Sequence, residues 1–131
     1  MKKTLIKSDK VHKEVSKYSH GWKIEGPGKV LVISGQGPVD VNGNVAPRFD
    51  FEKHVRQAFE NLRNMLAAGG ATFQDIVYLG VLLTDQNQWQ FFDRLRGEYL
   101  KEPYPATTLL VVKSLCNPDW MIEIEAIAMI D

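Results

Sequence analysis

The sequence predicts an α+β fold in which two helices pack on one face of a mixed sheet. Apolar residues alternate with a period of two in several short segments and recur with a helical period in two longer ones. The predicted elements follow the order β-β-β-α-β-α-β-β along 131 residues. A chain of this length can bury a substantial core, so we expect a single domain over residues 1–131.

Three strands are expected before the first helix. Residues 3–7 and 18–25 alternate weakly between apolar and polar side chains, and residues 30–33 form a continuous apolar run. Gly26-Pro27-Gly28 and Asn42-Gly43-Asn44 are predicted turns.

The first helix is expected to begin after Asp50, a plausible N-cap, and to end at Gly69-Gly70. A single apolar stripe runs along it, made of Phe51, Val55, Ala58, Phe59, Leu62, Met65 and Leu66. Thr72 with Asp75 then resembles a short capped turn.

A strongly apolar strand is predicted at 76–83, and a second helix after it. Asn87 is the expected N-cap of that helix, and Pro103 and Pro105 are expected to stop it. Its apolar side would consist of Trp89, Phe92, Leu95 and Tyr99. The last strands are expected at about 107–112 and 120–129.

Composition argues against several classes of protein. Lysines plus arginines equal aspartates plus glutamates, so the chain has no general attraction for nucleic acids. No segment has the length and apolarity of a membrane span, and no signal peptide is visible. Cys116 is the only cysteine, which fits a reducing, cytoplasmic setting, and His12, His20 and His54 show no metal-ligand spacing.

The strands at 30–33, 76–83 and 109–112 are apolar on both faces, as strands covered on both sides are. Two helices can cover only one face of the sheet. We expect a homo-oligomer to cover the other face, because a bare one would be a large exposed apolar patch. The alternative is that loops and the N-terminal segment cover it.

The last predicted strand carries two carboxylates on one face. With a period of two, Glu123 and Glu125 lie about 6.6–6.8 Å apart along the strand. Carboxylates among apolar side chains are candidates for acid–base chemistry. The simpler interpretation is the solvated face of an antiparallel strand.

Six segments, in order along about 110 residues, resemble the RidA family, also called YjgF or L-PSP. They are Tyr18-Ser19; Val32-Ile33-Ser34-Gly35-Gln36 with Pro38; residues 55–62, Val-Arg-Gln-Ala-Phe-Glu-Asn-Leu; Leu82-Leu83-Thr84-Asp85 with Asn87; Tyr104-Pro105-Ala106; and residues 122–128, Ile-Glu-Ile-Glu-Ala-Ile-Ala.

The resemblance implies a chorismate-mutase-like fold, a homotrimer with a cleft between neighbouring subunits, and hydrolysis of reactive imines or enamines. It implies Glu123 and Tyr18 as catalytic residues and no cofactor or metal. The implied substrate-binding residues are Ser34, Gly35, Asn87, Thr107 and Thr108. Glu123 would activate a water molecule, and the Gly35 N–H would face developing charge.

The chain departs from the family pattern at Thr107, where deaminating members carry an arginine that binds the substrate carboxylate. Three interpretations follow: the enzyme acts on a different imine, another cation such as Arg48 or Lys113 supplies the charge, or the cleft binds a small molecule without catalysis. Ser16-Lys17 is a second departure, because the family usually has Gly-Pro before this tyrosine.

The favoured function is therefore an imine or enamine deaminase with an altered substrate. The alternative is a non-catalytic protein that binds a small molecule in the same cleft. A ribonuclease, a label attached to some family members, is disfavoured by the zero net charge and by the lack of a basic, aromatic patch.

Overall fold

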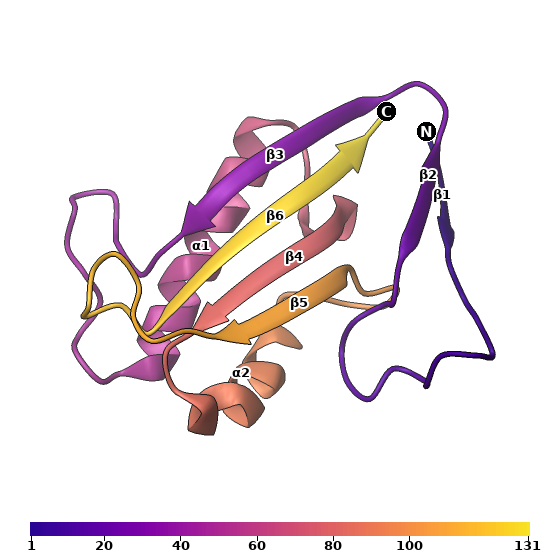
Figure 1. The fold of residues 1–131 in the computed structure, drawn as a ribbon. Coiled ribbons are helices and arrows are strands. Elements are labelled where there is room, and N and C mark those ends of the chain that lie inside the picture. Colours follow the sequence, from indigo (N-terminus) through magenta and orange to yellow (C-terminus); the bar gives the residue numbers. More distant parts are fainter.

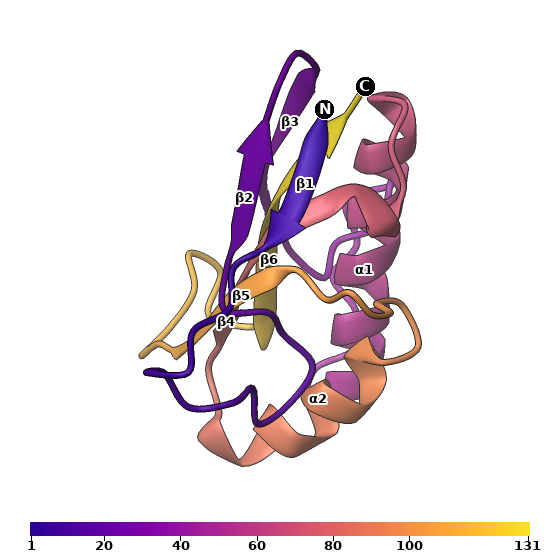
Figure 2. The same ribbon diagram turned by 90° about the vertical axis from the view of Figure 1, so that its right-hand side faces the viewer.

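A computed structural model describes all residues from Met1 to Asp131, and its elements follow the predicted order (Figure 1). Four strands form the main sheet in the order β3-β6-β4-β5, with β4 and β5 parallel and the other neighbours antiparallel. Their bounds are β3 (Lys29–Gln36), β4 (Ile76–Leu83), β5 (Ala106–Val111) and β6 (Ile122–Ile130). The helices α1 (Phe51–Ala68) and α2 (Trp89–Arg96) lie on one side of this sheet (Figure 2), which confirms the predicted fold class.

The first two strands form a separate sheet. Strand β1 (Lys2–Leu5) pairs with β2 (Trp22–Glu25) in an antiparallel hairpin at one end of the molecule. Both strands are shorter than the sequence predicts, since residues 6–21 form a long connection with a single bridge from Ser19 to Ala106.

Helix α1 begins and ends where the sequence predicts. The Asp50 side chain accepts a hydrogen bond from the Lys53 backbone N–H at 3.1 Å, and Gly69 caps the other end. Thr72 and Asp75 form the expected capping box of a 3₁₀ turn (Phe73–Asp75). These short-range predictions hold because each depends only on side chains within one turn of the backbone.

The prediction for the second helix is wrong at both ends. Asn87 is not its N-cap: this residue lies in a 3₁₀ turn (Gln86–Gln88), where its backbone N–H donates to the Asp85 side chain. Helix α2 starts at Trp89 without a side-chain cap and ends at Gly97, well before Pro103. Asp85, two residues before Asn87, carries a carboxylate, which is the stronger acceptor, and it caps the 3₁₀ turn.

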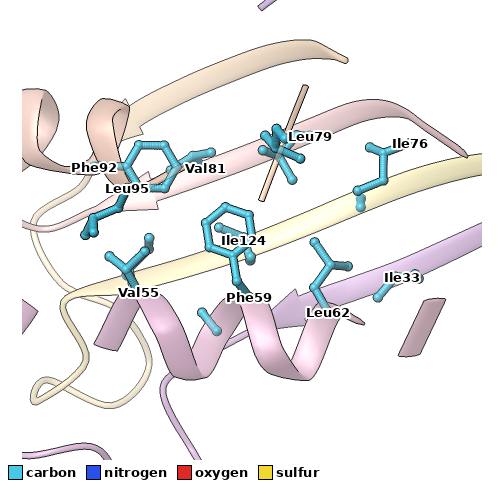
Figure 3. Close-up of a cluster of buried hydrophobic side chains, with 14 of the residues drawn as sticks. Ile33, Val55, Phe59, Leu62, Ile76, Leu79, Val81, Phe92, Leu95 and Ile124 are labelled. Atoms are coloured by element: carbon cyan, nitrogen blue, oxygen red, sulfur yellow. The ribbon is translucent and has the colours of Figure 1, made fainter. Parts of the chain in front are cut away.

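The core lies between α1, α2 and the inner face of the sheet (Figure 3). Phe59 is fully buried at its centre, and its ring stacks on Tyr99 with centroids 4.4 Å apart. Tyr99 therefore joins the core although it lies beyond the end of α2. Met65 is the one member of the predicted α1 stripe that stays exposed.

The opposite face of the sheet is open. Val30, Val32 and Leu110 expose 52%, 78% and 52% of their surface there. The N-terminal hairpin does not pair with the main sheet and leaves these side chains uncovered. No helix of the chain has the length and apolar character needed to cross a bilayer.

Candidate functional site

A bulge in β3 brings Gly35 against Glu123. Pairing between β3 and β6 shifts register between Ile33 and Gln36, so Ser34 and Gly35 leave the regular ladder. A Cβ atom placed on Gly35 would lie 2.6 Å from the Glu123 carboxyl carbon. The carboxylate can therefore occupy this position only because residue 35 has no side chain.

Glu125 makes the same kind of contact with a different glycine. It pairs with Gly80 on β4, where an added Cβ would lie 2.7 Å from the Glu125 Cγ atom. The two carboxylates thus lean in opposite directions, Glu123 over β3 and Glu125 over β4. Together with Gly35 and Leu82 they line a hollow of about 220 Å³ on the open face.

Neither carboxylate takes part in an ion pair or a side-chain hydrogen bond within the chain. Glu123 is half-buried and Glu125 is exposed. Their acceptor atoms are thus free for water or for a ligand bound in the hollow.

Tyr18 and Thr107 lie at the outer edge of the sheet, along β5. Ser19 donates its backbone N–H to the Pro105 carbonyl at 3.0 Å, which brings the connection before β2 alongside the start of β5. Tyr18 is half-buried and lines a separate hollow of about 520 Å³ together with Tyr104. The Thr107 hydroxyl donates to the same Pro105 carbonyl at 3.1 Å.

Register decides which face each threonine occupies. Thr107 pairs with the buried Leu79 and shares the helix-covered side of the sheet, whereas Thr108 pairs with Gly80 on the open face. Thr108 is therefore the nearer of the two to the Glu123 hollow. Thr107 is on the other side of the sheet.

Within one chain, the predicted site residues fall into separate groups. Gly35, Thr108 and Glu123 lie on the open face, with Ser34 exposed in the adjoining bulge. Tyr18 and Thr107 form a second group at the β5 edge. Asn87, exposed in the turn after β4, belongs to neither hollow.

The candidate cations lie outside the Glu123 hollow. Arg48 forms an ion pair with Asp119 at 3.5 Å, and Lys113 is exposed beyond the end of β5. Arg56 is held by Glu52, Tyr99 and Glu98, and these hydrogen bonds raise the pKa of Arg56. This arginine therefore ties α1 to the segment after α2.

Two polar residues of α1 that were not predicted as site residues, His54 and Asn61, hold the backbone around the site. His54 is fully buried; its Nδ1 accepts a hydrogen bond from the Met121 N–H at 3.2 Å, just before β6. This bond leaves the proton on Nε2, which donates to the Pro47 carbonyl at 2.9 Å. Asn61 donates to the carbonyls of Gly37 and Val39, just after β3.

A sequence signal for His54 did exist. His54 stands one helical turn before Ala58 of the apolar stripe, so its side chain is expected on the buried side of α1. A buried imidazole needs hydrogen-bond partners.

No group of three or more histidine, cysteine or acidic side chains is arranged to hold a metal ion. Cys116 and His20 are exposed, and the His20 ring meets the Tyr18 ring edge-on with centroids 5.5 Å apart.

Comparison with known proteins assigns the chain to a family. The family model described as endoribonuclease L-PSP matches residues 10–130. A RutC family protein of Pyrococcus horikoshii is 32% identical over 126 residues, covering 96% of this chain and 97% of that protein. The RutC family protein YjgH of Escherichia coli is 38% identical over 101 residues, 76% of each chain.

Solved structures agree with this assignment. The Rid family protein YyfB of Yersinia pestis, described as of unknown function, superimposes with a TM-score of 0.88 at 26% identity, covering 99% of this chain and all of that one. RidA from an Antarctic Psychrobacter superimposes with a TM-score of 0.72 at 30% identity, covering 97% and 99%. The chain therefore belongs to the endoribonuclease L-PSP family, which groups it with the RutC and Rid proteins.

Proposed function

We propose that the protein hydrolyses a reactive imine or enamine to a carbonyl compound and ammonia, in a homotrimer whose clefts each combine residues of two subunits. The observation that carries this proposal is the Glu123 carboxylate: it is unpaired, it lies against Gly35, and it lines a hollow on the open face of the sheet. Membership of the family that includes the RutC and Rid proteins supports a general Rid-family role.

The chemistry needs only a base and donors. Glu123 accepts a proton from water as the water oxygen bonds to the imine carbon, and the C=N electron pair moves to nitrogen, which takes up a proton. The resulting tetrahedral carbinolamine expels ammonia and leaves the carbonyl group. Water is the only co-reactant, so the balance requires no oxidant, metal or cofactor.

The trimer would complete the cleft. The Glu123 hollow and the Tyr18 hollow are separate in one chain, and the open face that bears Glu123 exposes Val30, Val32 and Leu110. Packing this face on a neighbour would bury the valines and leucine. It would also let the edge group of one subunit, with Tyr18, approach the Glu123 hollow of the next.

The proposed change of substrate follows from the lack of a free cation beside the Glu123 hollow. Thr107 offers no positive charge, and its hydroxyl already donates to Pro105, while Arg48 is paired with Asp119. A substrate carboxylate would therefore meet carboxylates rather than a cation in the hollow. The proposed substrate is an imine or enamine with a neutral group where other deaminases bind a carboxylate.

The test measures carbonyl and ammonia release from imines generated in situ, above the spontaneous rate, over side chains and end groups of different charge. Glu123→Gln should lower the catalysed rate by about 10²–10⁴-fold, the usual contribution of a general base. Glu125→Gln is the matched control, because it removes an equal charge from the same strand face but leans away from Gly35, and it should retain most of the activity.

Two results would contradict the proposal. If wild type is inert on the whole panel but Thr107→Arg is active, the result favours a non-catalytic binding site in this chain, or a substrate outside the panel. If the Glu123 and Glu125 variants lose activity equally, Glu123 is not the base. The trimer has its own test: Val32→Lys should shift sedimentation toward monomers, whereas Val41→Lys, at a still more exposed valine outside the sheet, should not.

A further inference from the structure

Asp93 of α2 receives hydrogen bonds from two different parts of the chain. Its Oδ1 accepts from the Ser16 hydroxyl at 2.5 Å and from Arg96 Nε and Nη2 at 2.9 and 2.6 Å. Its Oδ2 lies 3.5 Å from the Lys17 ammonium. The carboxylate therefore links the helix to the connection that precedes Tyr18.

The helix side of this cluster is buried and closely packed. Arg96 is only 2% exposed, and its guanidinium lies over the Phe92 ring at 5.4 Å from the centroid. A buried guanidinium needs a carboxylate partner, so Arg96 fixes where the Asp93 carboxylate points. Partial burial would raise the pKa of Asp93, but the hydrogen bonds from Ser16 and Arg96 outweigh it and lower the pKa, which keeps the group ionised.

The loop side fits closely against the same helix end. The Lys17 stem packs on Gly97, where an added Cβ would lie 2.9 Å from the Lys17 Cε atom. The next residue, Tyr18, donates its backbone N–H to the Ser16 carbonyl at 3.1 Å.

A second anchor follows directly after Tyr18. Ser19 is buried; its backbone N–H donates to Pro105 and its hydroxyl donates to the Tyr104 carbonyl at 2.5 Å. The tyrosine is thus held from both sides, by α2 before it and by the start of β5 after it, while residues 7–15 are all exposed.

The resemblance described above implies that Ser16 and Lys17 of this chain stand where the family usually has Gly-Pro. A proline restricts its own φ angle and that of the residue before it, so a Gly-Pro pair orients the following tyrosine through backbone stiffness. This chain lacks that restriction. Charge-assisted hydrogen bonds to Asp93 supply a different means of restricting the same segment.

We propose that Ser16, Lys17 and Asp93 form a polar clasp that positions Tyr18 for its role in the cleft, in place of the stiff Gly-Pro segment. Asp93 is here a positioning residue and not a catalytic one, because it acts through Ser16 and Lys17. The catalytic consequence depends on the proposed function, but the clasp itself does not.

The first variant of the test changes the loop side only, so that the buried pair of Arg96 and Asp93 stays intact. In Ser16→Ala/Lys17→Met, backbone amides of residues 15–19 should exchange with deuterium faster, and kcat/KM should fall by about tenfold to a hundredfold, as expected when a group near the chemistry shifts by up to 1 Å. Ser8→Ala is the matched control: it removes an exposed hydroxyl from the same connection, one that accepts a hydrogen bond from the Lys10 backbone N–H, and it should change neither readout.

A rescue separates positioning from general stability. Ser16→Gly/Lys17→Pro should restore slow exchange and kcat/KM, because backbone stiffness replaces the polar clasp; no hydrogen bond from the Lys17 N–H is lost to proline. In that background Asp93→Asn should cost less kcat/KM than it does in wild type.

Unchanged exchange and unchanged kcat/KM in Ser16→Ala/Lys17→Met would overturn the clasp, and so would an equal effect of Asp93→Asn in both backgrounds. If wild type shows no turnover on any imine, the proposed function fails, and the exchange data alone then decide whether the clasp exists.

Discussion

The contact between Gly35 and Glu123 gives the sharpest prediction. In Gly35→Ala, the new methyl carbon would begin 2.6 Å from the Glu123 carboxyl carbon and from its Oε1. Favourable contacts between carbon atoms lie near 3.5–4.0 Å, so the carboxylate must retreat by about 1 Å. Glu123 is only half-buried and has room to turn, so the fold should tolerate the change.

Activity should suffer far more than stability. A displacement of about 1 Å at a catalytic group can cost about 10²-fold in rate, which corresponds to about 2.7 kcal/mol in the activation free energy. The assay is kcat/KM on whichever imine the wild type hydrolyses fastest, together with a thermal melt. Activity should fall about a hundredfold while the melting temperature changes little.

The matched control is Gly80→Ala, which brings a methyl group within 2.7 Å of the Glu125 Cγ atom and leaves Gly35 untouched. If both alanine variants lose the same activity, crowding anywhere on this face is harmful and the special role of Glu123 is refuted. Full activity in Gly35→Ala would also refute it, since the carboxylate would then work equally well from another position.

Three further predictions concern stability. Phe59→Ala should lower the free energy of unfolding by about 3–5 kcal/mol, because it empties the centre of the core; denaturant titration measures this, and a loss below 1 kcal/mol would show that the core collapses around the gap. His54→Phe should cost about 1–3 kcal/mol by leaving the Met121 N–H without its acceptor, a loss that His54→Gln should partly restore. Folding lowers the pKa of Asp93, so the ionised Asp93 should stabilise the fold above the ordinary pKa near 3.9, and this contribution should vanish as pH falls through the lower folded pKa. The free energies of unfolding of wild type and Asp93→Asn should therefore converge in acid. A difference that stays constant with pH would contradict this.

The elements that the sequence predicts correctly are those encoded by neighbouring residues. Helix α1 has both its caps and its apolar stripe within its own segment, so its bounds are those expected. The end of α2 is different, because it depends on a tertiary contact: Tyr99 leaves the helix and stacks on Phe59 from another helix. No local pattern encodes such a contact.

The candidate site shows the same contrast between features set by local sequence and features set by tertiary pairing. The alternation in β6 correctly places Glu123 and Glu125 on one face, since a strand has a fixed period. The placement of Thr107 needed the register of β5 against β4, and the placement of Gly35 needed the bulge in β3. Both are properties of strand pairing, which residue order alone does not specify.

The strand order also dictates when this protein can fold. Strand β6, the last element along the chain, lies between β3 and β4 at the centre of the sheet, so neither of these strands has a pairing partner on its inner side until residues 122–130 arrive. During synthesis, the apolar segments of β3, α1 and β4 are made first, and they stay exposed until β6 can pair with β3 and β4. Sheets closed by such distant contacts form slowly and expose their strands to aggregation. Pairing of β6 therefore decides whether the earlier strands β3 and β4 reach the native state.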